Sequence, residues 1–220
     1  MDRYSKRLIE VDMPIKRISA HARKEKSVRQ GHVSSLHIWW ARRPLAACRS
    51  VICAGLWPDP ADENCPSLFR ETARNLMHQW AANNINLVSQ ESWSRFVSFQ
   101  KDPHKLSDNI ELRNALLDFI ADFADWENSA NKYFIKTARI LTQTANETLS
   151  NTQGVKPLVV DPFAGGGAIP IEALRIGTDV YASDLNPIAA LLNKILVEYI
   201  PKYKHRLINE VEKWGNWIKE

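Results

Sequence analysis

Apolar side chains recur at every third or fourth position through most of residues 69–150, and this spacing predicts a block of amphipathic helices. Asp102-Pro103 and Ser107-Asp108-Asn109 interrupt the pattern and predict turns between the helices. The apolar stripes are Phe69, Ala73, Leu76, Met77 and Trp80; Leu112, Leu116, Phe119, Ile120 and Phe123; and Phe134, Ile135, Ala138, Ile140 and Leu141. We expect these stripes to form a core, because the block contains no catalytic signature.

The pattern changes after residue 156, where short β-branched runs replace the helical stripes. Val159 and Val160 lie in a run at 157–161 that suits a parallel strand covered on both faces. A second strand is expected at 179–184 with a helix between the two, so the crossover should be right-handed. Further helices are expected at 188–200, ending at Pro201, and at 205–219. The predicted fold class is α/β with a large helical part.

The turn between the two predicted strands contains three consecutive glycines, Gly165, Gly166 and Gly167. Glycine allows backbone angles closed to other residues and a close approach by a ligand, and the following helix directs free N–H groups at the turn. Asp184 follows about 20 residues later, the distance at which nucleotide-binding folds place an acid for the ribose hydroxyls. Asn186 is expected to cap the next helix. A glycine-rich turn that binds nothing is the alternative, but turn, acid and spacing agree.

The N-terminal part contains an unusual cluster at Trp39, Trp40, Arg42, Arg43 and Pro44. The proline suits the first turn of a buried helix over 45–56, which would place both arginines at its positive end. Such a cluster suits phosphate, a carboxylate or a flipped base. The alternative is that the tryptophans pack this segment onto the core while the arginines pair with acids.

Two histidines, a strongly polar stretch and a proline-rich stretch complete the N-terminal part. His32 and His37 are expected to be structural, and no metal site is indicated. Residues 21–31 are expected to be a helix capped by Gly31 or a loop. Residues 57–68 are expected to be a linker because they are rich in proline.

The charge is distributed unevenly along the chain. Residues 1–60 hold 12 Lys and Arg against 5 Asp and Glu, a balance of +7, whereas the whole chain carries +4. This suggests a polyanionic partner, with a merely solvated surface as the alternative. Three cysteines without a paired spacing, no secretory signal and no run of about 20 apolar residues favour a reduced, cytoplasmic protein without a membrane segment.

The run Asp161 to Gly167 resembles the first motif of S-adenosylmethionine-dependent methyltransferases, in the form common among DNA enzymes that methylate amino groups. Ser183 to Pro187 resembles their second motif. The resemblance implies that the backbone of Gly165, Gly166 and Gly167 lies against the methionine moiety, that Asp184 binds the ribose, and that Asp161 orders the loop. Phe163 and Asn186 lie within these motifs and are expected at the cofactor.

The stretches 25–32 and 36–47, which include the Trp-Trp-Ala-Arg-Arg-Pro run, resemble the opening of a family of adenine-specific DNA methylases. Its members carry an N-terminal domain of unknown function, and many are linked to phage defence. The two resemblances cover about half of the chain, roughly 5–60 and 157–200. They imply a Rossmann-like methyltransferase fold, S-adenosylmethionine as cofactor and DNA as partner. Trp39, Trp40, Arg42, Arg43 and Pro44 are expected at the cofactor's methionine end or on the DNA path.

One expected motif is missing from these 220 residues: an Asp/Asn/Ser-Pro-Pro-aromatic loop that would hold the target base. We therefore expect no catalytic residue here and only half of an active site, completed by a longer chain or by a second subunit. The expected division is a basic segment 1–60, a helical insertion 61–155 and an incomplete cofactor-binding domain 156–220. A methyltransferase-like scaffold without activity and an RNA or protein methyltransferase are the rival functions.

Overall fold

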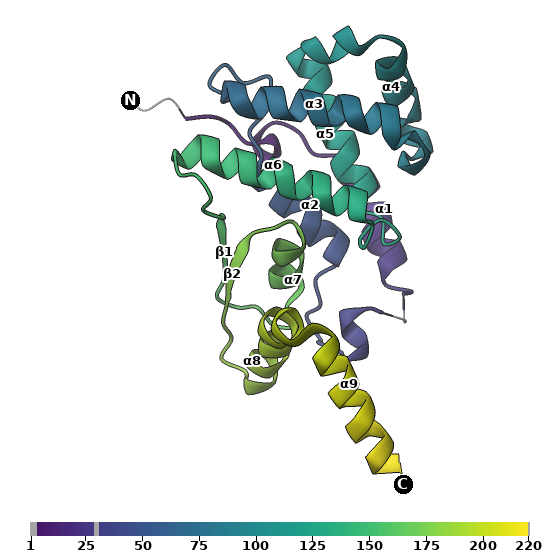
Figure 1. The fold of residues 1–220 in the computed structure, drawn as a ribbon, viewed down its shortest axis with the longest axis vertical. Coiled ribbons are helices and arrows are strands. Elements are labelled where there is room, and N and C mark those ends of the chain that lie inside the picture. The colour runs from purple at the N-terminus through teal and green to yellow at the C-terminus, as the bar shows by residue number, and fades with distance from the viewer. Residues whose placement is uncertain (1–3, 29–30, 220) are drawn as a thin grey trace.

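The computed structural model describes residues 4–28 and 31–219. A helical body comes first, and a small sheet with its helices follows (Figure 1). The body contains α1 (Ile15–Glu25), α2 (Leu45–Leu56), α3 (Ser67–Asn83), α4 (Gln90–Lys101), α5 (Asn109–Phe123) and α6 (Lys132–Ser150). The second part contains β1 (Leu158–Asp161), α7 (Ala168–Arg175), β2 (Asp179–Ala182), α8 (Pro187–Asn193), a π-helical segment (Lys194–Tyr199) and α9 (Ile200–Lys219).

The core of the helical body is aromatic. The Trp80 ring packs edge-on against Phe119 and Phe134, with centroid distances of 4.9 and 4.6 Å. The predicted stripes supply most of this core, so the predicted helical block is confirmed. Leu8 and Trp57, from outside the block, are buried in the same core. The segments before and after residue 60 therefore share one hydrophobic interior.

The prediction of a linker over 57–68 is wrong. Trp57, Pro58, Asp59 and Pro60 are buried, and the Trp57 indole N–H donates to Thr142 Oγ1 at 3.0 Å. Asp59 is 1% exposed and accepts from Arg113 Nε at 2.8 Å. The prolines interrupt helical structure in this segment, but the segment stays packed because the side chains between them have partners in the helical body.

The two predicted strands form a parallel pair in which Val159 aligns with Val180 and Val160 with Tyr181. Helix α7 packs against both strands. The prediction that both faces are covered is wrong for the described residues, since Leu158, Val160 and Tyr181 are each more than half exposed. These three side chains share the face away from α7, because alternate residues of a strand point to opposite faces. The described chain is thus mostly helical, with an α/β unit of two strands.

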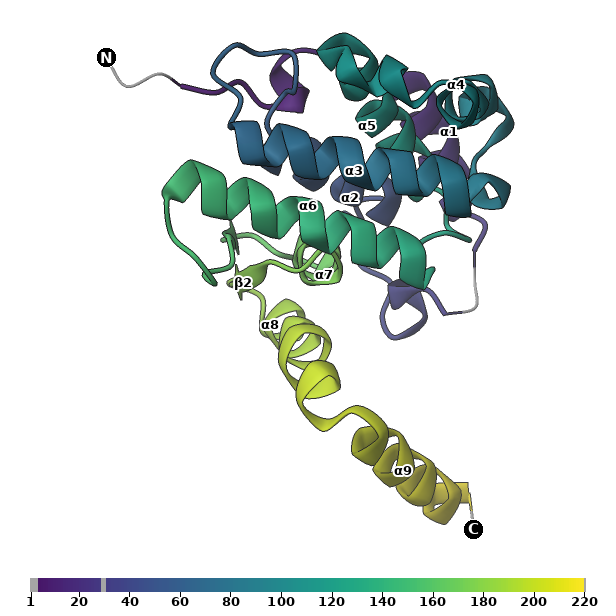
Figure 2. The same cartoon turned by 45° about the horizontal axis from the view of Figure 1, so that its top comes forward.

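Of the two alternatives for residues 21–31, the helix holds only as far as Glu25, where α1 ends, and a turn follows at Lys26 and Ser27; Arg29 and Gln30 lie outside the described residues. One predicted helix boundary is wrong. The C-terminal helix passes through Pro201, which falls in the first turn of α9, where proline's missing N–H matters least. The break lies at Lys204 instead, where φ is 46°. Beyond that kink α9 extends away from the body (Figures 1 and 2). No helix in the described ranges has the length and apolar character to cross a membrane.

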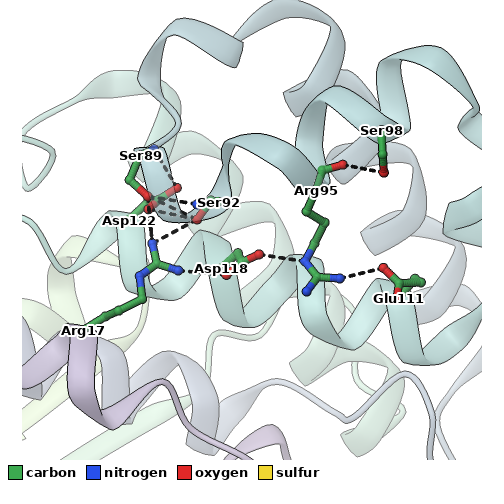
Figure 3. A network of polar contacts seen from close by, with 8 residues as sticks. All are labelled: Arg17, Ser89, Ser92, Arg95, Ser98, Glu111, Asp118 and Asp122. Carbon is green, nitrogen blue, oxygen red and sulfur yellow. Dashed lines mark hydrogen bonds and ion pairs between the residues drawn. The ribbon is translucent and has the colours of Figure 1, made fainter.

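A polar network fastens α1 to the helices that follow it (Figure 3). The Arg17 guanidinium donates to Asp118 at 2.8 Å, and also to Asp122. Its second terminal nitrogen donates to the Ser89 and Ser92 hydroxyls at 2.9 Å each. Burial raises the pKa of Asp122, while the hydrogen bonds from Ser89 and the charge of Arg17 oppose that rise. One side chain thereby links α1 to the start of α4 and to α5.

A second charged group joins the helical body to the α/β unit. Arg49 of α2 and Glu172 of α7 are 1% and 0% exposed, and Arg49 Nε donates to the Glu172 carboxylate at 2.7 Å. Arg49 also donates to the Phe123 carbonyl at the end of α5 and lies over the Phe123 ring at 4.7 Å. Arg175 donates to the same carboxylate at 2.9 Å. Each charge in this group has a partner, which offsets the cost of removing it from water.

Replacing Arg49 by methionine is expected to lower the free energy of unfolding by about 3–5 kcal/mol, because Glu172 would keep its buried charge and lose a partner. Urea denaturation followed by circular dichroism measures this. Lys156→Met is the control, since the Lys156–Asp179 pair is more than half exposed and should contribute about 0–1 kcal/mol. An equal effect of both substitutions would contradict the role given to Arg49.

Candidate functional site

The glycine turn connects the end of β1 to the start of α7. Gly165 and Gly167 have φ of 51° and 80°, in the left-handed region that favours glycine. The Gly167 N–H donates to the Ala164 carbonyl at 2.9 Å, and the Ala164 N–H donates to the Ser183 carbonyl at 3.0 Å. The turn therefore lies beside the end of β2, where Asp184 follows.

Asp184 is bound to the glycine turn by its carboxylate. One oxygen accepts the Gly165 N–H at 2.8 Å, and the other accepts the Asn186 N–H at 2.8 Å. These two backbone bonds hold the pKa of Asp184 below its ordinary value. An ionised carboxylate has about four acceptor positions, so the exposed side of this group can still accept hydrogen bonds from a ligand.

The other residues of the two motifs have separate structural roles. Asp161 is 9% exposed and accepts the Phe163 N–H at 3.2 Å, which closes a local turn. The Phe163 ring is 79% exposed. Asn186 accepts the Ile188 N–H at 2.9 Å and so caps α8, as predicted.

A pocket lies between the glycine turn and the N-terminal segment. The turn and the start of α7 line one side with Asp161, Phe163, Ala164, Gly165, Gly166, Ala168 and Ile169. The other side is lined by His32, Val33, Ser34, His37, Trp39, Ala41, Arg42, Arg43 and Leu45. Two sequence segments that are more than 100 residues apart thus meet at one site.

Five of the residues predicted for the site do not line this pocket. Trp40 is 89% exposed, and Pro44 is the cap residue before α2. Asp184 and Asn186 follow β2 beside the turn, where Asp184 accepts the Gly165 N–H, and Gly167 is the cap residue before α7.

Trp39 covers the glycine turn directly. A Cβ atom on Gly165 would lie 2.6 Å from Trp39 Nε1, and one on Gly166 would lie 3.0 Å from Trp39 Cβ. Real Cβ atoms do not approach other atoms as closely as 2.6 Å. Because these glycines have no side chains, both the Trp39 indole and a ligand can approach the backbone of the turn.

The positive end of α2 follows Arg42 and Arg43, as the sequence predicts, and an acid of the same chain fills it. The Glu25 carboxylate occupies it, accepting the Leu45 and Ala46 N–H groups at 2.9 Å each. Glu25 is 2% exposed and also contacts His32 Nε2 at 2.9 Å. An acid 20 residues earlier in the chain thus caps this helix, and His32 has the structural role that the sequence predicted.

The same cluster extends to one of the pocket arginines. His32 Nδ1 accepts the Ser34 N–H at 3.0 Å, and Arg42 donates to Ser34 Oγ at 2.8 Å. Arg43 makes no hydrogen bond or ion pair within the ranges that the structure describes. The pocket therefore has one arginine that is held in place and one that is available.

Sequence reasoning missed Asn193, a buried residue of α8. Its side-chain N–H groups donate to the Gly165 carbonyl at 3.0 Å and to the Ala189 carbonyl at 2.8 Å. Within an apolar helical run it has the appearance of an ordinary helix residue. The one local sign of its role is its position nine residues after Asp184, because the side chains of Asp184 and Asn193 both bond to Gly165.

Comparison with known proteins identifies two families. Residues 12–81 match the family described as a protein of unknown function (DUF1156), and residues 118–219 match the D12 class of N6 adenine-specific DNA methyltransferases. The type II methyltransferase M.MvaI of Kocuria varians is 34% identical over 119 residues. That alignment covers 51% of this chain and 26% of the relative. No solved structure matches the chain significantly.

These matches fall on the segments that carry the sequence motifs. The first includes α1, the Trp39–Arg43 cluster and α2, and the second includes the glycine turn and Asp184. The resemblance inferred from the motifs is confirmed: residues 12–81 match the DUF1156 family, and residues 118–219 match the D12 class of adenine methyltransferases.

Proposed function

We propose that the pocket between the glycine turn and the N-terminal segment binds S-adenosylmethionine, and that the chain serves methyl transfer to the exocyclic amino group of adenine in DNA. The observation that carries the proposal is the bond between Asp184 and Gly165, which joins the two cofactor motifs in one structure. The match to the D12 class supports the reaction and the DNA substrate.

The residues present fit such a cofactor. The turn offers backbone without side chains at Gly165 and Gly166, Asp161 offers a nearly buried carboxylate, and Asp184 offers exposed acceptors. In this proposal Asp184 accepts hydrogen bonds from the ribose and Asp161 faces the amino group of the methionine part. Phe163 lies at the rim, and Asn186 holds Asp184. When bound, the cofactor supplies an electrophilic methyl group.

Arg43 is proposed to bind the carboxylate of the methionine part, with Arg42 as a second positive charge at the same wall. Arg43 lines the pocket and no described side chain neutralises it, whereas Arg42 is held by Ser34. A guanidinium is well suited to a carboxylate because its N–H groups match both oxygens. Trp39 then shares the turn with the cofactor, while exposed Trp40 is left for the DNA side.

The base-binding loop must come from outside these 220 residues in this proposal, because they contain no Pro-Pro-aromatic motif. A second polypeptide or a further segment would supply it. The rival is a scaffold that binds the cofactor or a partner and transfers nothing; it is favoured by the same missing motif. A methyltransferase that acts on RNA or protein is the other rival function.

Replacing Asp184 by alanine is expected to lower the affinity for S-adenosylmethionine at least tenfold, measured by isothermal titration calorimetry, because both the ribose contact and the Gly165 anchor disappear. Since the pKa of Asp184 lies below its ordinary 3.8, its carboxylate stays ionised from pH 5 to 8. Its contribution is therefore constant there and is lost only as the pH falls through that lowered pKa. Asp179→Ala, at the opposite end of β2, is the control.

Affinity unchanged by Asp184→Ala would remove the basis of the proposed site. Loss of affinity in both variants would indicate damage to the strand pair and not loss of a ligand contact.

The role of Arg43 is tested with two ligands, S-adenosylmethionine and its decarboxylated form. Arg43→Gln is expected to weaken binding of the first about tenfold or more and to leave binding of the second unchanged, because only the first carries the carboxylate. Arg23→Gln, on the exposed side of α1, is the control. An equal loss with both ligands would refute the carboxylate contact, and a loss confined to DNA binding in gel-shift assays would assign Arg43 to the DNA path.

The reaction is tested by incubating the protein with DNA and S-adenosylmethionine, then measuring N6-methyladenine and N4-methylcytosine by mass spectrometry of the nucleosides. We expect N6-methyladenine when a polypeptide with the Pro-Pro-aromatic loop is present, and none with this chain alone. Methylcytosine would redirect the proposal to another base. Cofactor binding without transfer under either condition would establish the scaffold function.

A further inference from the structure

Gly165 is held by two side chains from opposite directions. Asp184 accepts its N–H at 2.8 Å, and the Asn193 amide donates to its carbonyl at 3.0 Å. The peptide groups on both sides of this glycine therefore have fixed orientations. Since φ at Gly165 is 51°, glycine adopts this geometry without steric cost, and the two hydrogen bonds select it among the conformations open to glycine.

The orientation of the Asn193 amide is determined by its surroundings. Its nitrogen donates to the Gly165 and Ala189 carbonyls, so a flipped amide would place its oxygen against two other oxygens. In the orientation found, Oδ1 is buried without a hydrogen-bond partner among the described residues. A buried acceptor without a partner destabilises a protein. Packing alone would thus be served better by an apolar side chain of similar size.

Asn193 also restricts which residue can occupy position 167 of the turn. A Cβ atom on Gly167 would lie 3.0 Å from Asn193 Oδ1 and 3.1 Å from Leu196 Cδ1. Leu196 belongs to the π-helical segment Lys194–Tyr199, which begins directly after Asn193. Single π-helical turns inside α-helices occur frequently at functional sites. The asparagine and the altered helix after it therefore both contact the glycine turn.

We propose that Asn193 is a positioning residue of this site: it sets the Gly165 carbonyl so that the turn keeps the shape in which it receives its ligand. The ligand itself rests on the proposed function. Asn193 does not line the pocket, so its effect on affinity would pass through Gly165. The unpaired Oδ1 is then retained because the amide N–H groups are needed.

The experiment compares Asn193→Leu and Asn193→Asp with Asn209→Leu and Asn209→Asp, exposed substitutions in α9. Three quantities are measured on the whole chain: the melting temperature, the affinity for S-adenosylmethionine, and the hydrogen exchange of peptides covering 161–169. Asn193→Leu is expected to change the melting temperature little, because it removes the unpaired oxygen but also leaves the Gly165 carbonyl without its donor. It should nevertheless weaken binding about tenfold and speed exchange in 161–169.

Asn193→Asp is expected to weaken binding further, since a carboxylate would face the Gly165 and Ala189 carbonyls. It also tests the proposal if the leucine variant fails to fold. Affinity and exchange at wild-type levels in the folded Asn193 variants would overturn the positioning role. If the wild type binds no S-adenosylmethionine but the Asn193 variants still speed exchange in 161–169, the proposed ligand fails while the positioning role stands.

Discussion

The contact between Arg49 and Glu172 connects the two halves of the candidate site. Arg49 lies on α2, whose first turn follows the Trp39–Arg43 cluster, and Glu172 lies on α7, which begins at the glycine turn. A charged pair that is fully buried tolerates little displacement, because either charge alone would be strongly destabilising. The distance between the two pocket walls is therefore set by this pair, through the helices that carry it.

The N-terminal segment then has a definite structural place in the pocket. Glu25 caps α2 and contacts His32. His32 bonds to Ser34, and Ser34 accepts a hydrogen bond from Arg42 at the pocket wall. Trp39 lies on Gly165 and Gly166, so the segments that match the two families meet at the glycine turn. The N-terminal segment therefore contributes directly to the shape of the site and is not an independent module attached to it.

Local features of the fold followed from sequence, whereas contacts between distant residues did not. The helical stripes, both strands and the Asn186 cap depend on neighbours within a few residues, and the pattern of side chains encodes them. Glu25 at the start of α2, Arg49 beside Glu172 and buried Trp57 depend on packing across 20 to more than 100 residues. The same limit explains Asn193, whose partner in the turn lies 28 residues earlier.

The glycine turn owes its shape mainly to side chains outside the sheet. Two parallel strands with one exposed apolar face are a weak framework on their own. The turn is fixed instead by Asp184, Asn193 and Trp39, and α7 is anchored to the helical body through Glu172. The glycine turn can thus keep its geometry with the two described strands, because the helical body holds α7 in place.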